Sequence, residues 1–168
     1  MINEIFVYLQ QNKIVLDMTE SFVIQSDIAN MPAVEERLFH FCRECNVGNY
    51  YSAVSVATMQ AVENAIVHGS GSNADKQVSV TFGTCRGGIF TEVKDDGAGF
   101  DFAQFGSLPS GDSTVGEGIF VMKTLADRME FADGGRRVRL EFEVAGIDPA
   151  QAMERIAVLN GHFALVAA

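Results

Sequence analysis

Three polar residues recur at four-residue intervals in the stretch MQAVENAIVHG (59–69). If the stretch is helical, Gln60, Asn64 and His68 form one row, because each step of four residues rotates the side chain by only about 40°. Glu63 is poorly placed to join that row. The row is either a solvent-facing polar stripe or one wall of a binding site, and the remainder of the chain has to decide between them.

A carboxylate and two glycines follow in the stretch VKDDGAGF (93–100). Asp95 would stand at the end of a strand, where it can accept a hydrogen bond from an exocyclic amine. Gly97 and Gly99 permit backbone angles that are closed to other residues and let the main chain approach a flat ligand closely. A tight turn with acidic surface residues accounts for the same letters equally well.

A second pair of glycines, Gly116 and Gly118, stands immediately before the helical pattern IFVMKTLAD (119–127). Amide groups at the start of a helix can donate hydrogen bonds to phosphate oxygens, and the helix dipole favours negative charge there. By itself the pair is also typical of a loop hinge.

The elements that would position these residues follow an α/β pattern. One helix is expected to begin at Pro32, and a second is expected to run from about 51 to 68. Alternating apolar and polar residues predict a hairpin, with strands around 78–82 and 89–93, and a further strand over 138–144. The polar side of that last strand predicts an open sheet face. We therefore expect a two-layer α/β (α+β) sandwich, in which a mixed, mainly antiparallel sheet is covered on one face by helices.

The 168 residues, of which 48% are hydrophobic, suffice for one well-buried domain, and no repeat or charged linker divides them. We expect a single domain over 1–168, with short additional strands at about 2–26 and a final helix at about 149–160. The formal net charge of −10 and the pI of about 4.6 oppose a general attraction to nucleic acids or anionic membranes. The first residues show no basic start before a long apolar run, so we expect a soluble, cytoplasmic protein.

Three cysteines suit a reducing compartment better than a disulfide framework. Cys42 and Cys45 form a CxxC beside His40, a pattern that zinc sites also use. No second ligand pair accompanies them, so buried and reduced cysteines are the preferred interpretation.

The order of these segments is much more specific than any one of them. A helix bearing Asn64 is followed by a DxGxG turn after a strand, by an irregular segment, and by a GxG that opens a helix. This order resembles the GHKL superfamily of ATP-binding proteins, which have the Bergerat fold and include gyrase, heat-shock chaperones, histidine kinases and MutL. Within it, MQAVENAIVHG, VKDDGAGF and GEGIFVMKTLADRMEF are most similar to bacterial anti-sigma-factor serine/threonine kinases, over residues 22–145 or so.

The resemblance implies a role for each of these residues. Asn64 would hold a Mg²⁺ that bridges the phosphates of the bound ATP or ADP, and Asp95 would accept from the adenine amino group. The adenine pocket would be formed by Gly97, Gly99 and Phe100, and the phosphates would be bracketed by Gly116 and Gly118. His68 occupies the position of a family histidine, for which we expect a structural role at the helix end.

Two departures from the family pattern concern catalysis. The family has a general-base glutamate four residues before the asparagine, whereas this chain has Gln60, which cannot accept a proton near neutral pH. The segment 101–115, which corresponds to the family's lid, contains no Lys or Arg to stabilise charge near the terminal phosphate. Lys123 could compensate, although a surface position on its helix explains it better. Nucleotide binding is therefore better supported than catalysis.

The leading hypothesis is a cytoplasmic regulator that binds ATP or ADP with Mg²⁺ and chooses between protein partners, a sigma factor and/or its anti-anti-sigma antagonist. The resemblance also implies a homodimer, and the acidic charge predicts no direct binding to nucleic acid or membrane. Two versions stay open: a serine/threonine kinase that phosphorylates the antagonist, and a nucleotide-gated pseudokinase. A detached ATP-binding module of a histidine kinase ranks lower, because no phosphoacceptor-helix domain is identifiable. The remaining alternative is an interaction domain that keeps this fold without binding nucleotide.

Overall fold

Five strands form one sheet in the computed structural model, which describes residues 18–101, 116–144 and 157–161. The strands are β1 (Thr19–Gln25), β2 (Gln77–Cys85), β3 (Gly88–Asp95), β4 (Arg128–Ala132) and β5 (Arg137–Glu143). Their spatial order is β1-β2-β3-β5-β4, and each pair of neighbours is antiparallel. The predicted α/β architecture is confirmed, with a sheet that is antiparallel throughout the described strands rather than mixed.

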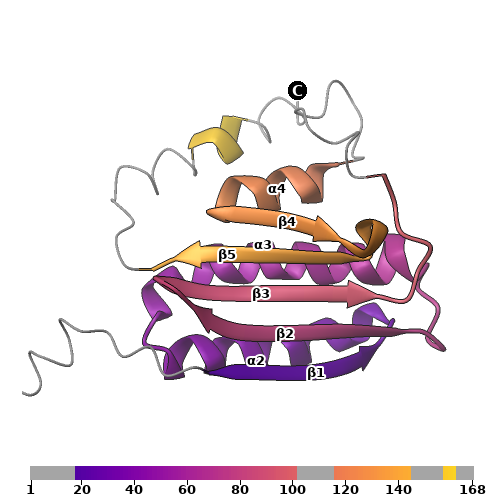
Figure 1. Cartoon of the computed structure of the whole chain (residues 1–168), viewed down its shortest axis with the longest axis horizontal. Helices are drawn as coiled ribbons and strands as arrows, with labels where there is room; N and C mark the ends of the chain where they lie inside the picture. Colours follow the sequence, from indigo (N-terminus) through magenta and orange to yellow (C-terminus); the bar gives the residue numbers. More distant parts are fainter. Residues whose placement is uncertain (1–17, 102–115, 145–156, 162–168) are drawn as a thin grey trace, which may run out of the picture.

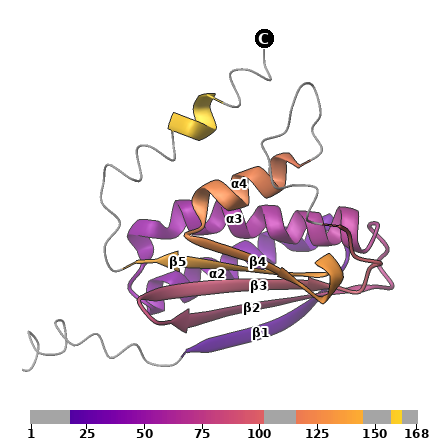
Figure 2. The same ribbon diagram turned by 45° about the horizontal axis from the view of Figure 1, so that its top comes forward.

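Three helices cover one face of this sheet and leave the other face open (Figures 1 and 2). They are α2 (Met31–Glu44), α3 (Tyr51–Asn64) and α4 (Glu117–Leu125). Short helical turns complete the order: η1 (Ile28–Asn30), η2 (Gly48–Tyr50), η3 (Ala65–Gly69) and η5 (Asp133–Gly135). Within the described ranges, no helix combines the length and the apolar character that a membrane crossing requires.

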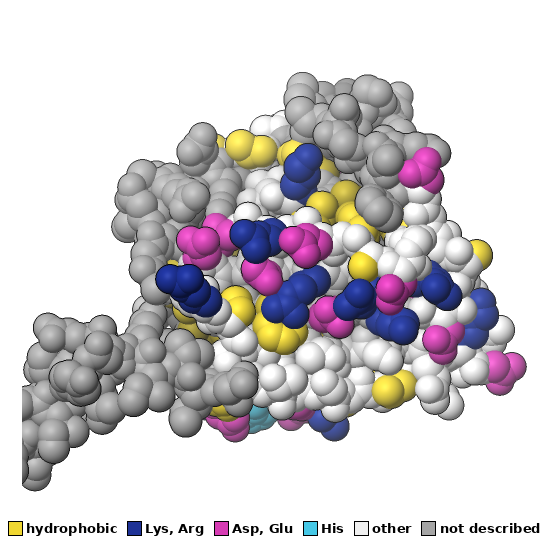
Figure 3. All heavy atoms as spheres, viewed as in Figure 1, with side chains coloured by type: hydrophobic (Ala, Val, Ile, Leu, Met, Phe, Trp, Pro, Cys, Tyr) yellow, Lys and Arg dark blue, Asp and Glu magenta, His cyan; other side chains and the backbone are white. Residues whose placement is uncertain are grey.

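The two faces of the sheet follow from strand alternation, since successive side chains point to opposite sides. Apolar residues on the helix side are buried, among them Val78, Val80, Phe82, Val138, Leu140 and Phe142. On the open face, basic and acidic side chains intermingle (Figure 3). There the guanidinium of Arg139 lies 3.6 Å from the centroid of the Phe90 ring and bonds Glu141 at 2.9 Å. The face of the sheet that was predicted to be open therefore carries charged side chains of both signs.

The helix α3 is attached to the sheet by a buried polar contact as well as by apolar packing. The hydroxyl of Thr58, on α3, donates to the hydroxyl of Thr91, on β3, at 3.1 Å, and both residues are buried. Because a buried hydroxyl without a partner costs free energy, this pair favours one placement of α3 along β3.

Two elements differ from the sequence-based expectation. The helix predicted to reach residue 68 ends as an α-helix at Asn64 and continues as a π-helical turn over Ala65–Gly69. The edge strand β4 was not predicted: it has only five residues, and none of them is fully buried. It is placed by its pairing with β5.

The ends of the chain are described only in part. Of the strands expected at about 2–26, the structure describes β1, and residues 2–17 lie outside the described ranges. Of the final helix expected at about 149–160, residues 157–161 are described and helical, and Leu159 packs against the core.

Candidate functional site

A cavity of about 350 Å³ lies where the end of α3, the end of β3, the start of α4 and the turn between β4 and β5 meet. Its lining includes seven of the residues singled out in the sequence: Asn64, His68, Asp95, Gly99, Phe100, Gly116 and Gly118. Much of the remaining wall is apolar and comes from Val93, Ile119, Met122, Phe131 and Val138. A mostly apolar cleft with a few convergent polar groups is the usual form of a small-molecule site.

The π-helical turn after α3 shapes one wall of the cavity. The amide of Ser70 donates to the carbonyl oxygen of Ala65 at 2.8 Å, five residues back, which closes a wider turn than an α-helix has. Asn64, the last α-helical residue, and His68 both line the cavity, and His68 is exposed. The polar row seen in the sequence therefore continues through the π turn into the site, with His68 at the helix end as expected.

The side chain of Asp95 is held in the wall beside that helix end. Only 6% of the residue is exposed, and its Oδ1 accepts a hydrogen bond from the amide of Gly97 at 2.7 Å. The backbone of Gly69 packs against the same carboxylate, so closely that a Cβ added at Gly69 would lie 2.5 Å from Asp95 Oδ2. Gly97 does not line the cavity. Its amide instead orients the Asp95 carboxylate, which does line it.

Burial is the main influence on the ionisation of Asp95. Desolvation raises the pKa of its carboxyl above the ordinary value of 3.8, and the nearby Asp96 adds to that increase. The Gly97 amide and the positive charges of Arg136 and Lys76 act in the opposite direction. A carboxylate in this setting is a strong acceptor for a ligand N–H, because few waters compete for it.

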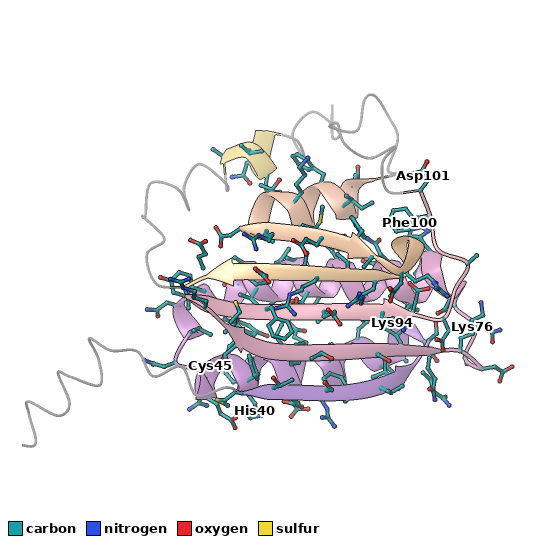
Figure 4. All side chains as sticks on the ribbon, in the orientation of Figure 1. His40, Cys45, Lys76, Lys94, Phe100 and Asp101 are labelled. Carbon is teal, nitrogen blue, oxygen red and sulfur yellow. The ribbon has the colours of Figure 1, made fainter. Side chains whose placement is uncertain are left out.

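The turn η5, between β4 and β5, lies beside Phe100 (Figure 4), and its Gly135 lines the cavity. The amide of Phe100 donates to the carbonyl oxygen of Gly134 at 3.1 Å, and the Phe100 ring meets the Phe131 ring edge-on, with centroids 5.3 Å apart. Gly99 has a φ of +78°, a conformation that favours glycine. Phe100 thus lines the cavity and is held there by a backbone hydrogen bond and a ring contact, and the turn before it uses a glycine conformation.

The start of α4 rests on α3 at the other end of the cavity. Gly116 precedes the helix with a φ of 95°, and Gly118 faces the polar row of α3. A Cβ at Gly118 would lie 2.8 Å from Gln60 Oε1 and 3.0 Å from Asn64 Nδ2, so glycine permits the close approach of the two helices. Lys123 lies in the last turn of α4, away from these glycines.

Gln60, which the sequence resemblance aligns with a general base, does not line the cavity. Its Nε2 donates to Glu63 Oε2 at 3.2 Å, while its Oε1 is the atom nearest to Gly118. Glu63 likewise does not line the cavity, in agreement with the direction expected from the helical wheel. The pair leaves a neutral amide oxygen, rather than a carboxylate, directed at the start of α4.

Arg136, which the sequence analysis did not single out, also lines the cavity. It follows the double glycine of η5 and lies opposite Asp95, whose amide donates to the Arg136 carbonyl oxygen at 2.9 Å. Only the register between β3 and β5 brings the two residues together, so no local motif could have identified it.

Comparison with known proteins identifies one family. The model of the histidine kinase-like ATPase domain matches residues 24–142, which include every lining residue of the cavity. No curated protein matches the chain.

The residues around the cavity fit a nucleotide. The apolar wall and Asp95 suit a purine with an exocyclic amine, and the glycines at 116 and 118 leave backbone exposed where phosphates would bind. Among the described residues, no cluster of three or more His, Cys, Asp or Glu could hold a metal ion by itself. The Asn64 amide oxygen could supply one ligand to Mg²⁺, which usually takes its other ligands from substrate phosphates and water.

We expect Gly118→Ala to weaken ADP and ATP binding by about tenfold or more. The added methyl would press on Gln60 Oε1 and Asn64 Nδ2, forcing the start of α4 away from α3 and disturbing the phosphate end of the cavity. Isothermal titration calorimetry measures the change. Gly48→Ala is the matched control, since a Cβ there meets nothing within 4 Å. Equal affinities of Gly118→Ala and the parent would contradict the assignment.

We expect Asp95→Asn to stabilise the ligand-free protein at pH 7 while weakening adenine-nucleotide binding. The raised pKa means that the folded protein binds more protons than the unfolded chain between pH 3.8 and the raised value. Lowering the pH through this window therefore stabilises the parent, and the advantage of Asp95→Asn should shrink. Urea unfolding as a function of pH tests this, with the exposed Glu36→Gln as a charge control. A variant less stable than the parent at pH 7 would contradict it.

Proposed function

We propose a function that starts from one finding: the chain belongs to the family of histidine kinase-like ATPase domains. Family membership implies nucleotide binding and points to an ATP-binding regulatory protein. We propose, more specifically, that it binds ATP or ADP with Mg²⁺ and switches between protein partners according to the nucleotide bound, as anti-sigma-factor serine/threonine kinases do.

The observation that carries the proposal is the placement of two recognition groups in one cavity. Asp95 lies buried beside an apolar wall, whereas Asn64 lies next to Gly118 at the start of α4. In our proposal the purine occupies the Asp95 side, with its exocyclic amine donating to the carboxylate. The phosphates extend toward Gly116 and Gly118, where the start of α4 supplies amide donors. Bound Mg²⁺ would neutralise phosphate charge beside Asn64.

The state of Gln60 favours regulation by binding over rapid phosphoryl transfer. An amide cannot remove a proton from a water or hydroxyl nucleophile, and the loss of a positioned base typically reduces the rate by about 10²- to 10⁴-fold. Glu63 is held by Gln60 Nε2 and is not in the cavity wall. We therefore propose a slow kinase or a nucleotide-gated pseudokinase, and not an efficient enzyme.

The proposed partners are proteins: a sigma factor, an anti-anti-sigma antagonist, and a second copy of the chain. The proposal rests on the resemblance of the three motifs to anti-sigma-factor kinases, together with the acidic net charge of −10, which disfavours direct binding to nucleic acid. A protein switch is also consistent with weak catalysis, because partner exchange requires a difference in affinity between nucleotide states and no chemical step.

We expect Mg²⁺-ADP to raise the thermal unfolding midpoint of the native chain, because a ligand that binds only the folded state stabilises it by mass action. At a concentration about 100 times the dissociation constant the stabilisation is about 2.7 kcal/mol. Asn64→Ala should lose the Mg²⁺-dependent part of the effect and retain the metal-independent part. Differential scanning calorimetry with and without Mg²⁺ separates the two. No shift with either ADP or ATP would overturn nucleotide binding.

We expect Gln60→Glu to raise phosphoryl transfer to a protein substrate by about 10²-fold or more, because it restores a base at the same helical position. Transfer of radioactive phosphate to a purified, co-eluting partner measures the rate. Gln60→Ala should stay as slow as the parent. Brisk transfer by the native chain that Glu63→Gln abolishes and Gln60→Ala leaves unchanged would show that Glu63 is the base, and the proposal of weak catalysis would fail.

A further inference from the structure

Arg136 supplies a donor and Asp95 an acceptor to the lining of the same cavity. The register pairs Val93 with Val138 and Lys94 with Arg137, which places Asp95 opposite Arg136. Arg136 precedes β5 with a helical backbone, and although the residue is partly open to solvent it lines the same cavity as Asp95. Arg137, the first residue of β5, belongs instead to the open face with Glu92, to which it is paired at 3.4 Å.

The Arg136 side chain is fixed at its stem. Its Nε donates to the carbonyl oxygen of Asp133 at 2.9 Å, and its Cγ lies next to Gly99, where an added Cβ would approach it to 3.3 Å. The nearest acidic side chain in sequence, that of Asp133, is paired with Arg137 and Lys94 at 3.2 and 3.9 Å. Among the described residues, no carboxylate forms an ion pair with Arg136. The end of its guanidinium is therefore available to a ligand in the cavity that it lines.

The chemistry of the pair matches one edge of a purine. Adenine presents its N6 amine, a donor, directly beside N1, an acceptor. An arginine offers several N–H donors in a planar fork, and a carboxylate only accepts. An acceptor and a donor placed side by side can thus bind both atoms of that edge, which one carboxylate alone cannot do.

We propose that Arg136 is a base-binding residue that donates a hydrogen bond to N1 of adenine while Asp95 accepts from N6. The inference rests on the proposed nucleotide binding and deepens it. The positive charge of Arg136 also lowers the pKa of Asp95 against the larger effect of burial, which favours the ionised form of the carboxylate.

The contact can be tested by measuring how the parent chain and Arg136→Met each bind two ligands. Calorimetric titration of the full chain without Mg²⁺ gives the affinities, because the base then makes a larger share of the binding free energy. The ligands are ADP and 1-deaza-ADP, in which N1 is replaced by C–H. Arg136→Met keeps an unbranched stem and removes the donors. We expect Arg136→Met to bind ADP about tenfold more weakly than the parent, because hydrogen bonds from charged donors are among the stronger ones. The parent should lose a similar factor with 1-deaza-ADP, and Arg136→Met should lose little more.

Arg137→Met is the matched control, one residue away on the open face, and it should bind both ligands as the parent does. Arg136→Lys, which keeps the charge without the planar fork, should recover only part of the loss. An equal loss for ADP and 1-deaza-ADP in Arg136→Met would overturn the N1 contact, since the arginine would then act through its charge alone. ADP binding unaffected by Arg136→Met would overturn it too, while leaving nucleotide binding intact. Failure of the parent to bind ADP at all would overturn the proposed function and this inference together.

Discussion

The burial of one carboxylate is the constraint on which the rest of the site depends. Removing Asp95 from water raises its pKa and destabilises its charged form, so the surrounding backbone must supply compensation. The Gly97 amide supplies part of it, and Gly69 supplies the space, because a side chain at either glycine would overlap the other groups of the cluster. The end of α3, the end of β3 and the turn that follows β3 are therefore forced together at one point.

The helix α3 connects the surroundings of Asp95 to the other end of the cavity. Its buried Thr58 is bonded to Thr91 on β3, and its last turn opens into the π-helical segment that brings Gly69 against Asp95. The same helix presents Gln60 and Asn64 to Gly118. One rigid element thus fixes the separation between the acceptor at the base side and the amide at the phosphate side. Rigid placement of this kind is what allows a binding site to select a ligand.

In the proposed function, Gln60 stands where a general-base carboxylate would be, and this difference changes chemistry while preserving shape. Glutamine is almost isosteric with glutamate, and its amide keeps a carbonyl oxygen on the side of α4 and gives a donor to Glu63. The glycines that the phosphates would need are retained. A site that keeps its binding geometry and lacks its base is consistent with a protein whose output is the nucleotide-bound state itself.

The layers of the fold and the order of the motifs could be predicted from local patterns in the chain. Helical spacing of Val34, Leu38 and Phe41 and the alternation along β2 and β5 are local patterns, and local patterns survive without knowledge of the partner element. The placement of Asn64, Asp95 and Gly118 around one cavity followed from the family resemblance, which carries tertiary information that periodicity lacks. Tertiary structure alone decided the β4 pairing, the π turn after Asn64 and the position of Arg136 opposite Asp95. Each of these depends on which residues face one another across strands or helices, and that register is set by packing between distant segments.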